Sequence, residues 1–144
     1  MSKITKLIDI KLKDTVLPIH GSLSAAGYDL YAVSKEVQDN IVTYELNVAI
    51  KVPENYVGLL FPRSSIYKTG LLMCNSVGVI DSDFTGFMKA KFYRLGKESP
   101  NEYKIGDRVV QLMIVPKVYV KWNQVEELET TKRGSGGFGS TGLK

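Results

Sequence analysis

Apolar and polar residues alternate with a period of two along several short stretches of the chain. Apolar side chains occupy every second position in residues 8–12, 46–52 and 88–92. Because successive side chains of a β-strand point to opposite faces of a sheet, this pattern predicts half-buried strands. Two further strands are expected at residues 56–61 and 108–120, the second with an edge or a bulge at Pro116.

Turn-forming residues separate the predicted strands, and helical periodicity is nearly absent. We expect one helical piece, of a turn or two, around residues 64–68. Many short strands at this spacing predict an all-β fold, either an antiparallel sandwich or a closed barrel. The chain has 144 residues, 44% of them hydrophobic and 24% charged, which is enough for one domain with its own core.

The composition changes at Thr130, where a segment rich in Gly, Ser and Thr begins. This segment has too few apolar residues to build a core. We therefore divide the chain into a β domain, residues 1–129, and a glycine-rich C-terminal arm, residues 130–144. The arm is either a frayed terminus or a phosphate-binding element, because its glycines expose backbone N–H groups and Arg133 supplies a forked cation.

Charge and composition exclude several classes of partner and site. The net charge of +4 is spread along the chain with no run of five basic residues, so we expect no nucleic-acid partner. The apolar stretches are too short to span a bilayer and the start does not resemble a signal peptide. We expect a soluble, cytoplasmic protein without a membrane partner, or a nuclear one in a viral or eukaryotic source. The single Cys74 and single His20 exclude an internal disulfide and a Cys/His zinc cage.

Two segments carry candidate chemistry. Asp81 lies in a turn beside the aromatic Phe84, where its carboxylate could polarise a water molecule, although a plain hairpin turn explains the segment equally well. Arg63, Ser64 and Ser65 follow an apolar strand and together favour an anion. The alternative is a helix cap at Ser64 with a surface arginine.

Two polar residues stand among apolar neighbours in predicted strands. Gln111 lies in the predicted strand that begins at Gly106–Asp107–Arg108, and an inward glutamine more often satisfies buried backbone than binds a ligand. Asp29 follows small residues and a turn in a similar way. Neither residue alone indicates a function.

Five segments, taken in order, resemble the motifs of the trimeric deoxyuridine triphosphate nucleotidohydrolases, the dUTPase family. They are AAGYDLYA, PRSSIYKTG, NSVGVIDSDFTG, GDRVVQLMI and RGSGGFGSTG. Each segment is weak by itself, but five in the family's order across nearly the whole chain form a specific pattern. The resemblance implies a jelly-roll-like β-barrel with a flexible glycine-rich C-terminal arm, in agreement with the strand pattern.

The resemblance also implies roles for residues at the matching positions. Asp81 would activate the water that attacks the α-phosphorus of dUTP, releasing pyrophosphate and dUMP, which keeps uracil out of DNA and supplies dUMP for thymidylate synthesis. Arg63 and Gln111 would act beside it at the phosphates. The implied substrate-binding residues are Ser64, Ser65, Asn75, Gly78, Val79, Ile80, Phe84, Arg133, Phe138, Gly139, Ser140 and Thr141.

Within that set the roles differ. Asn75 and the backbone of a hairpin after it would read uracil, Arg133 would hold the terminal phosphate, and Phe138 would cover the base. Mg²⁺ would be held mainly by the triphosphate, with Asp29 reaching its waters. Three chains would share each site in a homotrimer.

Two positions depart from the family's usual residues. Phe84 replaces a tyrosine whose ring packs on deoxyribose, and Ser65 replaces a common glycine. The related dCTP deaminases need a glutamate where this chain has Lys91, which disfavours that activity. A non-catalytic nucleotide-binding regulator of the same fold is the remaining alternative.

Overall fold

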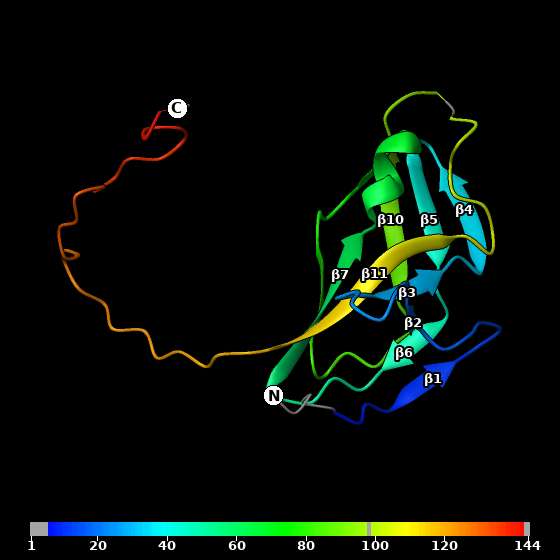
Figure 1. The fold of residues 1–144 in the computed structure, drawn as a ribbon, viewed down its shortest axis with the longest axis horizontal. Coiled ribbons are helices and arrows are strands. Elements are labelled where there is room, and N and C mark those ends of the chain that lie inside the picture. The colour runs from blue at the N-terminus through cyan, green and yellow to red at the C-terminus, as the bar shows by residue number, and fades with distance from the viewer. Residues whose placement is uncertain (1–5, 98, 143–144) are drawn as a thin grey trace.

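The computed structural model describes residues 6–97 and 99–142, and within them the regular structure is almost entirely β (Figure 1). One short 3₁₀ helix, η1 (Ser64–Lys68), occupies the position where a helical turn was expected. In this described part of the chain, no helix has the length and apolar character needed to cross a membrane. The predicted all-β class is confirmed.

The strands form three antiparallel sheets. The largest has five strands in the order β2 (Ile19–His20), β3 (Tyr28–Tyr31), β11 (Arg108–Pro116), β7 (Tyr56–Pro62) and β9 (Gly78–Ile80). The second has four, in the order β4 (Ser34–Gln38), β5 (Ile41–Glu45), β10 (Lys89–Arg94) and β8 (Leu71–Met73). A short pair joins β1 (Ile10–Leu12) to β6 (Val48–Ile50). This arrangement is consistent with a jelly-roll-like barrel.

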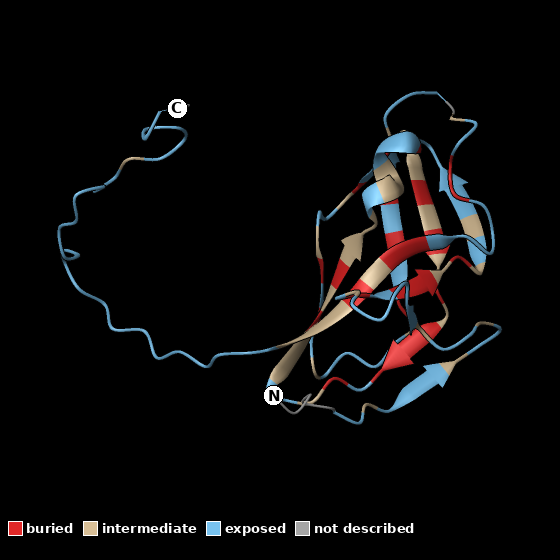
Figure 2. Ribbon diagram, viewed as in Figure 1, coloured by how far each residue is buried: buried red, intermediate tan, exposed pale blue. Residues whose placement is uncertain are grey.

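All three sheets contribute to one hydrophobic core (Figure 2). On β10 the predicted alternation is confirmed, because Ala90 and Phe92 are buried while Lys89 and Lys91 are exposed. Strand β6 differs from the predicted half-buried pattern, since all of its residues are buried. The predicted inward residues Leu46, Val48, Ile50 and Val52 are buried, and the departure is Ala49, which is buried between them. β6 pairs with β1 on one edge, and the Val48 carbonyl accepts a hydrogen bond from the Met88 N–H at 2.9 Å.

The strand predicted at residues 108–120 ends earlier, at Pro116. β11 pairs with β7 up to this residue, and one further backbone hydrogen bond, from the Lys117 N–H to the Asn55 carbonyl at 2.8 Å, closes the ladder. Every residue from Pro116 to Gly142 is exposed except Gly136, so packing ends well before the composition changes at Thr130. This exposed segment, residues 116–142, runs away from the sheets (Figures 1 and 2).

Two hairpins considered from the sequence are absent from the described pairings. β8 and β9 belong to different sheets, and so do β9 and β10. The segment after Asn75 and the segment around Asp81 are therefore turns that carry the chain from one sheet to the other. The reading of residues 80–86 as a plain hairpin turn is wrong for this reason.

Candidate active site

The register of the five-stranded sheet places two predicted site residues side by side. Asp29 on β3 is directly opposite Gln111 on β11, and Gln111 is directly opposite Phe61 on β7. Because directly paired residues point to the same face of a sheet, the carboxylate and the amide share one face. Arg63 follows two residues after Phe61, where β7 leads into η1.

The Asp29 carboxylate joins two arginines. Its Oδ1 accepts a hydrogen bond from Nε of Arg63 at 3.0 Å, and its Oδ2 accepts one from a terminal nitrogen of Arg108, also at 3.0 Å. Asp29 is only 7% exposed, whereas both guanidinium groups reach toward solvent. One nearly buried negative charge thus fixes two outward-reaching positive charges, an arrangement suited to a polyanionic ligand.

Gln111 is engaged with the backbone, as the residue type suggested. Its side-chain amide donates a hydrogen bond of 3.1 Å to the carbonyl of Pro62, the residue before Arg63. Gly27 makes room for it, since a Cβ at that position would lie 2.7 Å from the Gln111 side-chain oxygen. Gln111 therefore fixes the backbone from which Arg63 extends.

The two serines after Arg63 have different surroundings. Ser64 is exposed, and the described residues provide it with no hydrogen-bond partner. Arg63 stands at the N-cap of η1 and no side chain caps the helix, so the reading of Ser64 as a cap is wrong. The Ser65 hydroxyl lies 3.2 Å from the hydroxyl of Tyr103.

A second group of predicted residues lies on and around β9. Asn75 is exposed in the turn before the strand, and Gly78 is buried against Leu60 of β7. A Cβ on Gly78 would come 3.1 Å from that of Leu60 and 3.6 Å from the Asn75 amide nitrogen. Glycine here therefore lets the Asn75 side chain lie close to the strand. Val79 is exposed and Ile80 is buried, as expected for alternating positions.

Asp81 and Phe84 occupy the turn after β9. Both side chains are exposed, and the Phe84 N–H donates to the Asp81 carbonyl at 3.1 Å. Lys51 Nζ holds the same turn through the carbonyl of Ser82, at 2.7 Å. Gly86 accommodates the aromatic ring, because a Cβ there would lie 3.0 Å from the Phe84 ring tip.

The two groups lie at opposite ends of β7. Ile80 pairs with Gly58, so Asp81 comes level with Val57, whereas Arg63 lies beyond the other end of the strand. Six residues of extended chain separate Val57 from Arg63, a distance of about 20 Å. Asp81 and Arg63 of one chain are therefore attached to the sheet at opposite ends of β7.

The arm residues form a third group, distant from both others in the chain. Tyr119 attaches the beginning of the exposed segment to the carbonyl of Glu54 at 2.8 Å. Beyond it, every hydrogen bond described for residues 120–142 lies within the segment itself, such as Arg133 Nε to the Gly136 carbonyl at 2.9 Å. Phe138 is fully exposed with a positive φ of 48°. Gly139, Ser140 and Thr141 are exposed as well.

Some residues of the site were not chosen from the sequence. The sequence placed Arg108 at the start of a predicted strand, within the GDRVVQLMI segment, without a role, and it assigned none to Gly27 or Gly86. Arg108 contacts a carboxylate 79 positions away, which no local pattern reveals. For Gly27, the run of small residues before Asp29 was the only hint in the sequence that another side chain packs closely there.

The described residues offer no protein cage for a metal ion. Nowhere within residues 6–97 and 99–142 do three His, Cys, Asp or Glu side chains gather in a way that could bind one. Asp29 is already paired with two arginines, but each of its oxygens accepts only one hydrogen bond from them. This donor set suits a Mg²⁺ ion that arrives on phosphates and meets Asp29 through water.

Comparison with known proteins gives a consistent result. A model of the dUTPase family matches residues 13–142. The chain is 36% identical to a deoxyuridine 5'-triphosphate nucleotidohydrolase of Ehrlichia canis, over 97% of this chain and 95% of that one. It is 37% identical to the enzyme of that name from Acinetobacter baumannii, over 95% of each chain. Its fold resembles the dUTPase of Staphylococcus bacteriophage 80alpha with bound dUPNHPP, with a TM-score of 0.82 and 28% identity over 96% of this chain and all of that one.

Proposed function

The chain belongs to the dUTPase family, and we propose that it hydrolyses dUTP to dUMP and pyrophosphate. The observation that carries the proposal is the Asp29 carboxylate bridging Arg63 and Arg108 beside the exposed Ser64. Two fixed guanidinium groups and a free hydroxyl match the charge and hydrogen-bond acceptors of a triphosphate. The family relationship and this geometry together favour hydrolysis over deamination, and Lys91 lies exposed on β10 where a deaminase needs a glutamate.

The residues of β7, η1 and β11 bind and orient the phosphates in this proposal. Arg63 donates to phosphate oxygens, Ser64 adds a hydroxyl, and Gln111 fixes the backbone before Arg63. Because these groups are already held by Asp29 and by the sheet, little reorganisation is needed when the substrate binds. Their role is to orient the α-phosphorus for in-line attack.

Asp81 is the proposed general base. Its exposed carboxylate directly follows β9, whose Gly78 and Ile80 are buried, so its backbone is anchored and the carboxylate remains accessible to water. It accepts the proton of the attacking water, and pyrophosphate leaves from the opposite side of the phosphorus. Asn75 and the backbone of Gly78, Val79 and Ile80 read the uracil edge, while Phe84 packs on deoxyribose.

Mg²⁺ bound by the triphosphate would neutralise phosphate charge and polarise the P–O bonds. Asp29 would meet its water ligands, since the described residues provide no denser carboxylate group. The protein's own contribution at this point is to hold Asp29 and the two arginines in fixed relation.

The active sites are shared between chains of a homotrimer. The distance of about 20 Å along β7 separates Asp81 from Arg63, so a complete site needs Asp81 of one chain and Arg63 of another. The exposed segment supports the same assembly, because it carries large apolar side chains that its own chain leaves uncovered. These are Val118, Val120, Trp122, Val125 and Leu128. Arg133, Phe138 and Gly139–Thr141 then close over the phosphates and base of a neighbouring site.

The test is incubation with each nucleotide and Mg²⁺, with detection of pyrophosphate. dUTP is the expected substrate, and dTTP, dCTP and UTP should be turned over much more slowly. A site that hydrogen-bonds the base rejects analogues that leave its polar groups unpaired. Comparable turnover of dCTP or UTP would contradict the proposed specificity, and nucleotide binding without any pyrophosphate release would indicate a regulator.

A further inference from the structure

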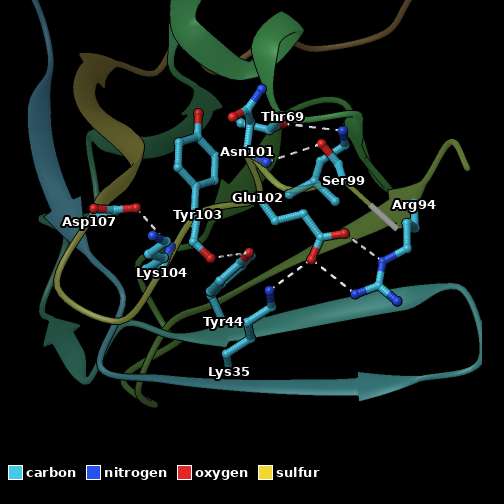
Figure 3. A network of polar contacts seen from close by, with 11 residues as sticks. Lys35, Tyr44, Thr69, Arg94, Ser99, Asn101, Glu102, Tyr103, Lys104 and Asp107 are labelled. Atoms are coloured by element: carbon cyan, nitrogen blue, oxygen red, sulfur yellow. Dashed lines mark hydrogen bonds and ion pairs between the residues drawn. The ribbon is translucent and has the colours of Figure 1, made fainter. Parts of the chain in front are cut away.

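The loop of residues 99–107 carries a buried ionic cluster that the proposed reaction does not use (Figure 3). Glu102 is 7% exposed and binds two cations from the four-stranded sheet. Its carboxylate accepts hydrogen bonds from Nε and a terminal nitrogen of Arg94, at 2.5 and 2.9 Å, and from Nζ of Lys35 at 2.7 Å. These hydrogen bonds lower the pKa of Glu102 to about 2, with Arg94 the largest cause.

Tyr103, the next residue, is fixed from three sides. Its carbonyl accepts a hydrogen bond of 2.9 Å from the Tyr44 hydroxyl on β5. Its ring packs edge-on against those of Tyr44 and Phe92, with centroids 6.2 and 6.5 Å apart. Tyr103 is 6% exposed, so these contacts are shielded from solvent.

The Tyr103 hydroxyl reaches η1, next to the proposed phosphate-binding residues Arg63 and Ser64. It lies 3.2 Å from the Ser65 hydroxyl, in the first turn of η1 and two residues after Arg63. Gln111 holds the chain just before this turn, through the Pro62 carbonyl. Ser65 is the residue that replaces the family's common glycine, and the structure gives its hydroxyl a partner in the core.

We propose that Tyr103 is a positioning residue for the phosphate-binding turn: through Ser65 it fixes η1, and thereby Arg63 and Ser64, relative to the four-stranded sheet. Glu102 anchors Tyr103 by its ion pairs with Lys35 and Arg94. Tyr103 touches no substrate in this account. The inference rests on the proposed dUTP hydrolysis, because it concerns how firmly that site holds its phosphate ligands.

The test uses substitutions that remove one hydroxyl and leave the packing unchanged. Tyr103→Phe and Ser65→Ala each break the contact, and the double variant removes both partners. Tyr93→Phe is the matched control, because Tyr93 is 43% exposed on β10 and the described residues give its hydroxyl no partner. Steady-state kinetics with dUTP and inhibition by dUDP and by deoxyuridine are measured for the full-length proteins.

Tyr103→Phe and Ser65→Ala should each lower kcat/KM for dUTP by about 3- to 10-fold, the worth of one hydrogen bond. The double variant should be no worse than either single one, because both remove the same contact. dUDP inhibition should weaken in parallel, while inhibition by deoxyuridine, which lacks phosphates, should not change.

Three results would overturn the inference while leaving dUTP hydrolysis in place. They are parental kinetics for Tyr103→Phe, additive losses in the double variant, or equal weakening of dUDP and deoxyuridine. If instead the parent protein released no pyrophosphate from dUTP, the proposed function would fail and the inference with it.

Discussion

The β body, residues 6–97 and 99–115, and the exposed segment, residues 116–142, hold different kinds of site residue. In the body, three of the proposed phosphate-site side chains are fixed by a neighbour: Asp29 by two arginines, Arg63 by Asp29, Gln111 by a backbone carbonyl. In the exposed segment, Arg133 and Phe138 have no described contact with the body. The phosphate-binding part of the body is therefore organised without a ligand, whereas in the proposed function the segment acquires its contacts from ligand and neighbouring chain. Loss of a fixed group such as Asp29 should affect stability and activity together, whereas loss of an exposed group, in the segment or in a surface turn of the body, should affect activity alone.

Removal of the arm tests the second half of this comparison. A chain ending at Thr131 should lose about 10²- to 10⁴-fold in kcat/KM for dUTP. The loss combines the charge-assisted contact of Arg133, about 1.5–3 kcal/mol, and stacking on Phe138, about 1–3 kcal/mol. The melting temperature without nucleotide should not change, because residues 132–142 pack on nothing in the body. Intact hydrolysis by the truncated chain would identify the arm as a frayed terminus.

Substitution of the proposed base affects chemistry without disturbing the body. Asp81→Asn should keep the melting temperature and dUTP binding while kcat falls by about 10²- to 10⁴-fold, because the amide keeps the size and loses the basicity. Asp83→Asn is the matched control in the same exposed turn and should retain parental activity. If the two variants exchanged these behaviours, Asp83 would be the base.

Asp29→Asn should weaken both stability and activity. The neutral amide leaves Arg63 and Arg108 without their shared carboxylate, so we expect kcat/KM to fall by about 10- to 100-fold. The melting temperature should fall by several degrees, as breaking a buried ion pair costs about 3–5 kcal/mol at most. Asp39→Asn makes the same change in an exposed turn with positive φ, where asparagine is well tolerated, and should match the parent. An unchanged melting temperature for Asp29→Asn would show that the carboxylate does not fix the two arginines.

The smallest effect concerns pH. Ion pairing lowers the pKa of Glu102 from 4.5 to about 2, so its stabilising contribution is complete above pH 4.5 and is lost as pH falls toward 2. Thermal unfolding of the parent should show this acid loss. Glu102→Gln should melt lower at pH 7 and lose less stability over that acid range. If Glu102→Gln lost as much stability as the parent between pH 4.5 and pH 2, the acid loss would come from other carboxylates.

Local patterns predicted the strands well where one face of a strand is buried and the other is exposed. On β10 the alternation of Lys89, Ala90, Lys91 and Phe92 matches their burial. On β6 the predicted inward residues Val48 and Ile50 are buried, but so is Ala49 between them. The strand predicted to run to residue 120 ends at Pro116. Alternation describes one strand and contains no information about what its neighbours cover.

The motifs identified candidate site residues, but they did not predict which of these residues contact each other. The contacts of Asp29 with Arg63 and Arg108 span 34 and 79 positions and depend on the register of β3, β11 and β7. The contact of Tyr103 with Ser65 spans 38 positions and joins a loop to a helix. Such pairs arise from sheet order, and sheet order is a property of the whole chain.

The central claim is that one active site takes Asp81 and Arg63 from different chains, and subunit mixing tests it most directly. Asp81→Asn and Arg63→Ala are each expected to be inactive alone. Unfolded together in equal amounts and refolded, they should form mixed trimers in which about one quarter of the sites have both groups intact, since each position is intact in about half of the chains. We expect about one quarter of parental activity from the refolded mixture, and none from the two proteins combined without unfolding. If Asp81 and Arg63 served the same site from one chain, every site would lack one group, and a refolded mixture without activity would contradict the account.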